Sequence, residues 1–131
     1  MKGIDTNVLV RYLVRDDEEQ AKTAVICIQK IIASGGLCFI SIIVLCELVW
    51  VLESAYGFQK KDIAEVLEKI LMTKQFEIEA RDIARLALND YRDGQGDFAD
   101  YVIGRNNRAN GCELTYTFDR SLKNHSGFVI L

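Results

Sequence analysis

Four acidic residues stand beside apolar segments at widely spaced positions of the chain. They are Asp5 in GIDTNVLV, Glu47 in SIIVLCELVWVL, Asp100 in GDFADYVIG and Asp119 in TYTFDRSL. Carboxylates next to core segments are costly to bury unless a cation or hydrogen bonds compensate their charge. Mg²⁺ and Mn²⁺ prefer such hard oxygen ligands, and ions held in this way can activate a water for phosphodiester hydrolysis. The set therefore predicts a divalent-metal site that needs no covalent nucleophile.

Each acid taken alone also has an ordinary structural explanation. Asp5 and Asp119 can end a strand or form a turn, and Glu47 can be a hydrogen-bonded acid at the margin of a helix. Asp97 and Asp100 are three residues apart near a predicted helix N-terminus, where one of them can serve as the cap. The functional interpretation depends on the whole set, because carboxylates brought together without a cation raise one another's pKa.

Strand and helix signals alternate along the chain. Short extended segments are predicted at 2–5, 37–40, 76–78, 113–117 and 127–131, with helical periodicity between them. This alternation favours an α/β fold in a single domain, residues 1–131, with a central parallel sheet flanked by helices on both faces. Sites in such folds lie beyond the carboxyl ends of the strands, which is where Asp5 and Asp119 are predicted to lie.

Composition limits the class of protein. A chain of 131 residues, half of them hydrophobic, suits one compact domain. The net charge of -3 argues against nucleic-acid binding by bulk basicity, although a local basic rim is compatible with it. The four cysteines lack metal-site spacing and favour reduced thiols in the cytoplasm. No segment resembles a membrane span or a secretion signal, so we expect a soluble cytoplasmic protein without membrane contact.

Four short motifs follow one another in a recognisable order. They are Ile4-Asp5-Thr6-Asn7-Val8-Leu9, Ser41 with Glu47 six positions later, Asp97-Phe98-Ala99-Asp100-Tyr101-Val102-Ile103, and Gly111-Cys112 with Thr117-Phe118-Asp119-Arg120. Together they resemble the PIN domain ribonucleases, especially the VapC-type toxins, over essentially the whole chain. The resemblance implies a parallel sheet flanked by helices and Mg²⁺- or Mn²⁺-dependent cleavage of RNA. It also implies a homodimer and inhibition by a small antitoxin protein.

The resemblance gives each motif residue a role. Metal binding and water activation are assigned to four acids: Asp5, Glu47, Asp100 and Asp119. Asp100 is preferred to Asp97 because it directly precedes the Tyr-Val-Ile stretch, as the family acid precedes its short apolar run. Supporting roles are assigned to four residues: Thr6, Asn7, Asp97 and Thr117. Some relatives carry a further acid where this chain has Ser121, so either one or two metal ions are compatible with the sequence.

Several functions are compatible with these features. The leading hypothesis is the toxin of a type II toxin-antitoxin system, an endoribonuclease that uses a metal-activated water. Its candidates for contacts with the RNA backbone are five basic residues: Lys60, Lys61, Arg105, Arg108 and Arg120. The alternatives are a catalytically silent PIN-like module that binds RNA or protein, and a solitary RNA-processing nuclease. A phosphatase of the haloacid dehalogenase type would require an acid where Asn7 stands. His125, in a polar loop, is predicted to lie on the surface without a chemical role.

Overall fold

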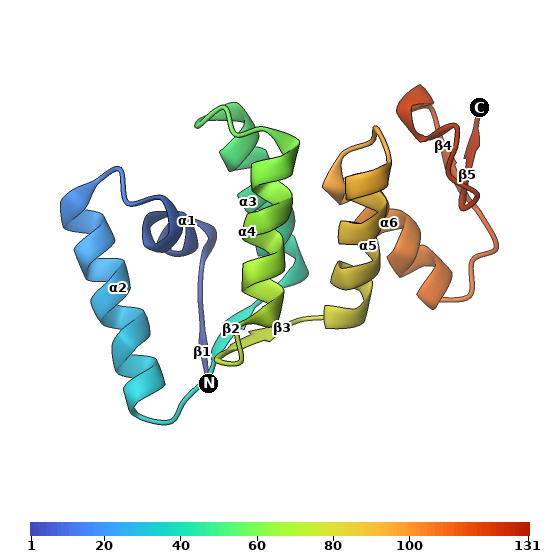
Figure 1. The fold of residues 1–131 in the computed structure, drawn as a ribbon. Helices are drawn as coiled ribbons and strands as arrows, with labels where there is room; N and C mark the ends of the chain where they lie inside the picture. Colours follow the sequence, from blue (N-terminus) through green and yellow to red (C-terminus); the bar gives the residue numbers. More distant parts are fainter.

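Helices and strands alternate along the chain in the computed structural model, which describes all residues 1–131 (Figure 1). The α-helices are α1 (Thr6–Val14), α2 (Glu18–Ala33), α3 (Ile42–Ser54), α4 (Lys60–Met72), α5 (Arg81–Asp93) and α6 (Phe98–Ala109). The strands are β1 (Lys2–Gly3), β2 (Cys38–Ile40), β3 (Phe76–Ile78), β4 (Thr115–Thr117) and β5 (Phe128–Ile130), and a 3₁₀ helix, η1, spans Arg120–Leu122. The predicted α/β class is confirmed. None of the helices is long and apolar enough to cross a membrane.

All strand pairs are parallel, but the strands form two sheets. One sheet has the order β1-β2-β3, and the other consists of β4 and β5. No backbone pairing joins them, so β1 and β4 each keep one free edge. Figure 1 shows α5 and α6 between the three-stranded sheet and the β4-β5 sheet.

Side-chain caps begin two of the N-terminal helices, α2 and α3. Asp17 accepts a hydrogen bond from the Gln20 amide at 3.0 Å and begins α2. Ser41 follows β2 and accepts one from the Val44 amide at 3.2 Å, which begins α3. α3 is apolar around most of its circumference and buries five residues, so Glu47 is an unusual member of it. The cap at Ser41 fixes where α3 begins and therefore where Glu47 falls on the helix.

A continuous core of 27 buried residues extends into both halves of the chain. The segments α6, η1 and β5 contribute five rings and aliphatic side chains to this core: Phe98, Tyr101, Val102, Leu122 and Phe128. The rings of Tyr101 and Phe128 meet edge to face with centroids 6.5 Å apart. This packing fixes the β4-β5 sheet against α6 although it is not hydrogen-bonded to the first sheet.

A half-buried carboxylate on α5, that of Asp90, holds the C-terminal part in place. Arg105 of α6 donates two hydrogen bonds to Asp90, at 2.7 and 2.8 Å, and His125 Nε2 lies 3.1 Å from the same carboxylate. The His125 side chain is only 21% exposed and packs on the rings of Tyr101 and Phe128. The prediction of a surface His125 is therefore wrong, because its polar sequence neighbours do not reveal a carboxylate 35 positions away.

Candidate functional site

The first group of candidate residues lies where β1 passes into α1. Asp5 is the N-cap residue of α1, and its side chain is exposed. Thr6 is buried, and its Oγ1 donates a 2.8 Å hydrogen bond to Glu47 Oε1 on α3. This contact joins residues 41 positions apart and directs the Glu47 carboxylate toward the start of α1. Asp5 and Glu47 are called the N-terminal acid pair below.

The second group lies where β4 ends and α6 begins. Asp97 is the N-cap residue of α6, and its amide donates to Asp100 Oδ2 at 3.3 Å, so both acids lie at one helix terminus. Asp119 follows β4, and its amide donates to Thr117 Oγ1 at 3.0 Å. The negative charge of Asp119 contributes to a raised pKa of Asp100, so the two carboxylates lie in the same neighbourhood. These two residues are called the C-terminal acid pair.

The members of the C-terminal acid pair have opposite pKa shifts. Partial burial raises the pKa of Asp100 above its ordinary value, and the negative charges of Asp97 and Asp119 add to the rise. Two hydrogen bonds from Ser121, from Oγ at 2.7 Å and from the amide at 2.9 Å, lower the pKa of Asp119. A cation or a proton would therefore bind more favourably at Asp100 than at Asp119, because the negative charge of Asp100 has less compensation from hydrogen bonds.

The two acid pairs do not meet within the chain. No three side chains of the His, Cys, Asp or Glu type lie close enough together to hold one metal ion. Among the supporting residues, Thr6 contacts an acid of the first group, while Asp97 and Thr117 contact acids of the second. Asn7 is exposed and lines a hollow with Arg11 and Gln20. The four carboxylates that the sequence predicts to form one centre therefore lie in two separate pairs in this chain.

Three of the five basic candidates are engaged within the chain. Arg105 is bound to Asp90, Arg108 donates to the Glu113 carbonyl at 3.0 Å, and Lys60 donates to the Gly94 carbonyl. Two basic side chains have no ion pair or hydrogen bond to another residue: Lys61 and Arg120. The second of these directly follows Asp119, so it provides positive charge at the C-terminal acid pair.

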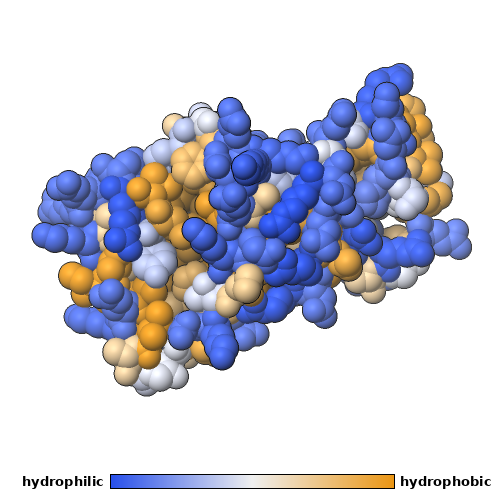
Figure 2. All heavy atoms as spheres, viewed as in Figure 1, coloured by the Kyte–Doolittle hydropathy of each residue, from blue (hydrophilic) through white to orange (hydrophobic).

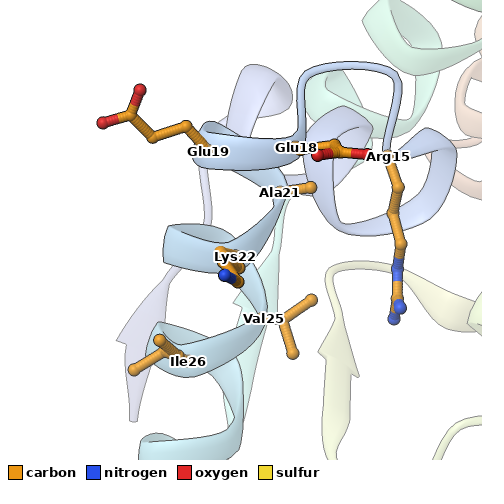
Figure 3. Close-up of a pocket in the computed structure, with 7 residues that line it drawn as sticks. All are labelled: Arg15, Glu18, Glu19, Ala21, Lys22, Val25 and Ile26. Atoms are coloured by element: carbon orange, nitrogen blue, oxygen red, sulfur yellow. The ribbon is translucent and has the colours of Figure 1, made fainter.

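The larger hollows of the surface lie away from both acid pairs. The largest, about 810 Å³, lies against α2, where Figure 3 shows Arg15, Lys22 and Val25 among the residues around it. A second hollow of about 450 Å³ lies between α6 and the β4-β5 part and is lined by Asp90, Arg105 and other residues. Neither hollow contains an acid of the predicted centre. Asp5, Glu47 and Asp119 are exposed and Asp100 is half-buried, so a long polymer can reach three of the four acids.

Sequence reasoning missed Asp90, Arg105 and Ser121 as partners in this part of the molecule. Ser121 was considered only as a position where a further acid is missing, yet its hydroxyl and amide hold one oxygen of Asp119. The spacing Asp119-Arg120-Ser121 is typical of a turn in which a carboxylate accepts from the amide two residues later, and this signal could have predicted the contact. Nothing comparable in the sequence indicates that Asp90 would pair with Arg105.

These features define a class of protein: an α/β chain with parallel strands, acids just beyond two strand ends, and a further acid on an apolar helix. The PIN domain family matches residues 3–127, and the chain belongs to this family. The chain is also similar to a VapC ribonuclease from Aquifex aeolicus (strain VF5), with 32% identity over 123 residues, which cover 94% of this chain and 90% of that protein. The family resemblance of the four motifs is confirmed.

Proposed function

We propose that the protein is a divalent-metal-dependent endoribonuclease, the toxin of a type II toxin-antitoxin system, that hydrolyses RNA phosphodiesters. Membership of the PIN domain family and similarity to a protein named as a VapC ribonuclease support the reaction class. The observation that carries the proposal is the match of residues 3–127 to the PIN domain. At the C-terminal acid pair, partial burial and the negative charges of Asp97 and Asp119 raise the pKa of Asp100. Such an unfavourable pair is typical of a cation site.

The donor set fits Mg²⁺ or Mn²⁺. All four predicted ligands, Asp5, Glu47, Asp100 and Asp119, offer carboxylate oxygens, and neither a thiolate nor an imidazole belongs to the set. The C-terminal acid pair already places two such ligands together, and a cation there would remove the repulsion that raises the pKa of Asp100. When bound, the cation polarises the phosphate and lowers the pKa of the attacking water.

The chain's own residues position these carboxylates. Thr6 donates to Glu47 and fixes one of its oxygens, while Ser121 fixes one oxygen of Asp119. The Asp97 amide holds Asp100 at the start of α6. Three of the carboxylates, those of Glu47, Asp100 and Asp119, thus keep an oxygen for a cation while the other is oriented by the protein, which is the usual arrangement around catalytic metals. Asn7 and Thr117 complete the proposed supporting set, next to Asp5 and before Asp119.

The partners follow from the same proposal. The substrate is RNA. Its phosphates would contact Arg120 and Lys61, the two basic candidates whose side chains have no partner within the chain. We include in the proposal a homodimer in the cytoplasm and a small antitoxin protein that inhibits the enzyme. Co-expression with the product of an adjacent small reading frame should give a complex of both chains in which RNA cleavage is suppressed.

The test is RNA cleavage with and without added Mg²⁺ or Mn²⁺, comparing the wild type with Glu47→Gln. We expect metal-dependent cutting by the wild type and a loss of at least about 100-fold in the variant, because a ligand charge is removed without a change in size. Glu65→Gln is the matched control, since Glu65 is exposed and lies on a different helix, α4. Equal activity of wild type and Glu47→Gln would refute the assignment of the centre.

The separation of the two acid pairs favours one second candidate, a catalytically silent PIN-like module that binds RNA or protein. Such a module would bind RNA without cutting it, and Asp5→Asn would leave the binding constant unchanged. The nuclease proposal instead expects Asp5→Asn to abolish magnesium-dependent cleavage. A gel assay that follows binding and cleavage of the same RNA separates the two functions.

A further inference from the structure

The two strands that precede the predicted metal ligands both have a free edge. The amides of Lys2 and Ile4 donate to the carbonyls of Leu37 and Phe39, so the pleat turns the N–H and C=O of Gly3 toward the opposite, unpaired edge of β1. In β4 the Thr115 amide donates to the Gly127 carbonyl and the Thr117 carbonyl accepts from the Leu131 amide, at the two ends of β5. The N–H and C=O of Tyr116 therefore point to the unpaired edge. Each edge therefore offers a donor and an acceptor for a further parallel strand.

Asp5 and Asp119 occupy equivalent positions relative to these edges. β1 ends at Gly3 and β4 ends at Thr117, so each aspartate lies two residues beyond the end of its strand. If β1 and β4 paired in parallel with the two aspartates level, Lys2 would stand opposite Tyr116. In that register the outward peptide groups of both strands face each other, as a parallel ladder requires. Pairing of the two edges would therefore bring the two acid pairs together.

The chain's own packing prevents its β4 from reaching its own β1. α5 is joined to α4 by ion pairs from Arg85 and Arg92 to Glu68, at 2.6 and 3.2 Å. The β4-β5 sheet is joined to α5 through the contact of His125 with Asp90 and to α6 by the buried ring of Phe128. Closing the chain on itself would require this core packing to be broken. A second copy of the chain can supply β4 without any such loss.

Apolar side chains remain exposed on both surfaces that would approach each other. On β4 and directly after it, Tyr116 is 67% and Phe118 82% exposed, and Figure 2 shows the β4-β5 part projecting from the body with apolar surface on its outer side. On α3, Ile43 and Trp50 are each 68% exposed and lie one turn to either side of Glu47. Exposed apolar surface that flanks a candidate site on both halves indicates an interface rather than ordinary surface.

We infer that two copies of the chain exchange their β4-β5 sheets, so that β4 of one copy pairs with β1 of the other and each metal centre contains residues of both chains. Asp5 and Glu47 of one subunit then meet Asp100 and Asp119 of the partner subunit, and a two-fold axis generates two such centres. The inference rests on the proposed function for its chemistry. The partner is a second copy of the chain, because the N-terminal acid pair of one copy and the C-terminal acid pair of the other complete one site and neither pair is sufficient alone.

Complementation of inactive variants tests the shared centre. Asp5→Asn and Asp119→Asn, each inactive by itself, are unfolded together, refolded at equal concentration and assayed for RNA cleavage. Shared centres predict recovery of about one quarter of the wild-type activity, since half of the dimers are mixed and each mixed dimer has one intact centre. The control mixes Asp5→Asn with Glu47→Gln, which lie on the same half and should remain inactive. An inactive Asp5→Asn and Asp119→Asn mixture would overturn the inference.

A covalent test works without any nuclease activity, so failure of the proposed function and failure of the exchange can be told apart. Lys2→Cys and Tyr116→Cys are introduced together into a chain in which the exposed Cys27 and Cys112 are replaced by serine. Adjacent strands hold opposite residues within disulfide distance. Oxidation should give a covalent dimer on a non-reducing gel. A monomer with an internal disulfide, or no disulfide at all, would refute the exchange even if the wild type cuts RNA.

Discussion

Asp100 and Asp119 approach each other from different elements, α6 and the turn after β4, and only one of them is compensated. Ser121 bonds to Asp119, while Asp100 is partly buried beside two carboxylates. The pKa of Asp100 is raised from its ordinary 3.8, so its favourable contribution to stability is present below pH 3.8 and is lost as the pH rises through the raised pKa. At neutral pH, without metal, the charged Asp100 destabilises the fold.

We therefore expect Asp100→Asn to stabilise the metal-free protein at pH 7. The gain in the free energy of unfolding should be at most about 1 kcal/mol because Asp100 is only partly buried. Urea unfolding should show the gain at pH 7 and its disappearance below pH 3.8. Added Mg²⁺ should reverse the order, because only the wild type retains the full ligand set. A variant that is less stable than the wild type at pH 7 without metal would contradict the assigned repulsion.

Thr6 tests whether the orientation of Glu47 matters for the reaction. Thr6→Val keeps the shape of this buried side chain and removes its 2.8 Å hydrogen bond to Glu47. We expect RNA cleavage to fall about 10- to 100-fold, as is usual when a group that orients a metal ligand is lost. Thr6→Ser retains the hydroxyl and should keep most of the activity. Equal loss in both variants would point to packing rather than to the hydrogen bond.

Asp90 should dominate the acid stability of the C-terminal part. Burial opposes its ionisation, but the hydrogen bonds from Arg105 and His125 outweigh burial and lower its pKa below the ordinary 3.8. Its contribution is therefore present above pH 3.8 and is lost as the pH falls through the lowered pKa. Asp90→Asn should cost about 2 kcal/mol at pH 7, with partial exposure of Arg105 taken into account.

The measurement is urea unfolding of Asp90→Asn and wild type from pH 7 to pH 3. The free energies of unfolding of the two proteins should approach each other at the lowest pH. There the wild type loses the stabilisation by the Asp90 charge, which the variant lacks at every pH. Asp93→Asn, an exposed acid at the end of the same helix, is the matched control and should follow the wild type. A constant difference between Asp90→Asn and wild type at all pH values would show that its charge is not the cause.

The elements of the fold were largely predictable from local signals. The N-caps at Asp17 and Ser41, the helical periodicity of α4 and the strand signal at Phe76–Ile78 depend on residues within one turn or one strand. The pairing of Asp97 with Asp100 followed from their spacing on one helix. Local chemistry was therefore sufficient wherever the partner of a residue lies within a few positions of it.

Contacts between distant segments were not predictable in the same way. The free edges of β1 and β4 arise because α5 is fixed to α4 and the β4-β5 sheet to α6. These attachments depend on distant pairs such as Arg85 with Glu68 and Tyr101 with Phe128. Strands of two or three residues contain too little pattern to specify their neighbours. The sequence consequently indicated four candidate metal ligands, but it did not indicate that they lie in two separate pairs within one chain.

Gly104 provides a test of the packing that fixes the β4-β5 sheet. A Cβ atom at this position of α6 would lie 2.6 Å from Cζ and 2.9 Å from Cε2 of Phe128. The ring cannot move freely because Tyr101 and His125 pack against it. Helix propensity alone would make Gly104→Ala stabilising by about 1 kcal/mol, whereas overpacking of a fixed ring costs about 1–3 kcal/mol.

We therefore expect Gly104→Ala to lower the free energy of unfolding by about 1 kcal/mol, measured by urea denaturation. The double variant Gly104→Ala with Phe128→Leu separates the two effects. Removal of the ring should relieve the clash, so that the alanine becomes stabilising relative to Phe128→Leu alone. If Gly104→Ala stabilises the protein with Phe128 intact, then the Phe128 ring is not packed tightly against α6. The β4-β5 sheet would then not be rigidly attached to α6, and this attachment could no longer explain why β4 does not pair with β1 of its own chain.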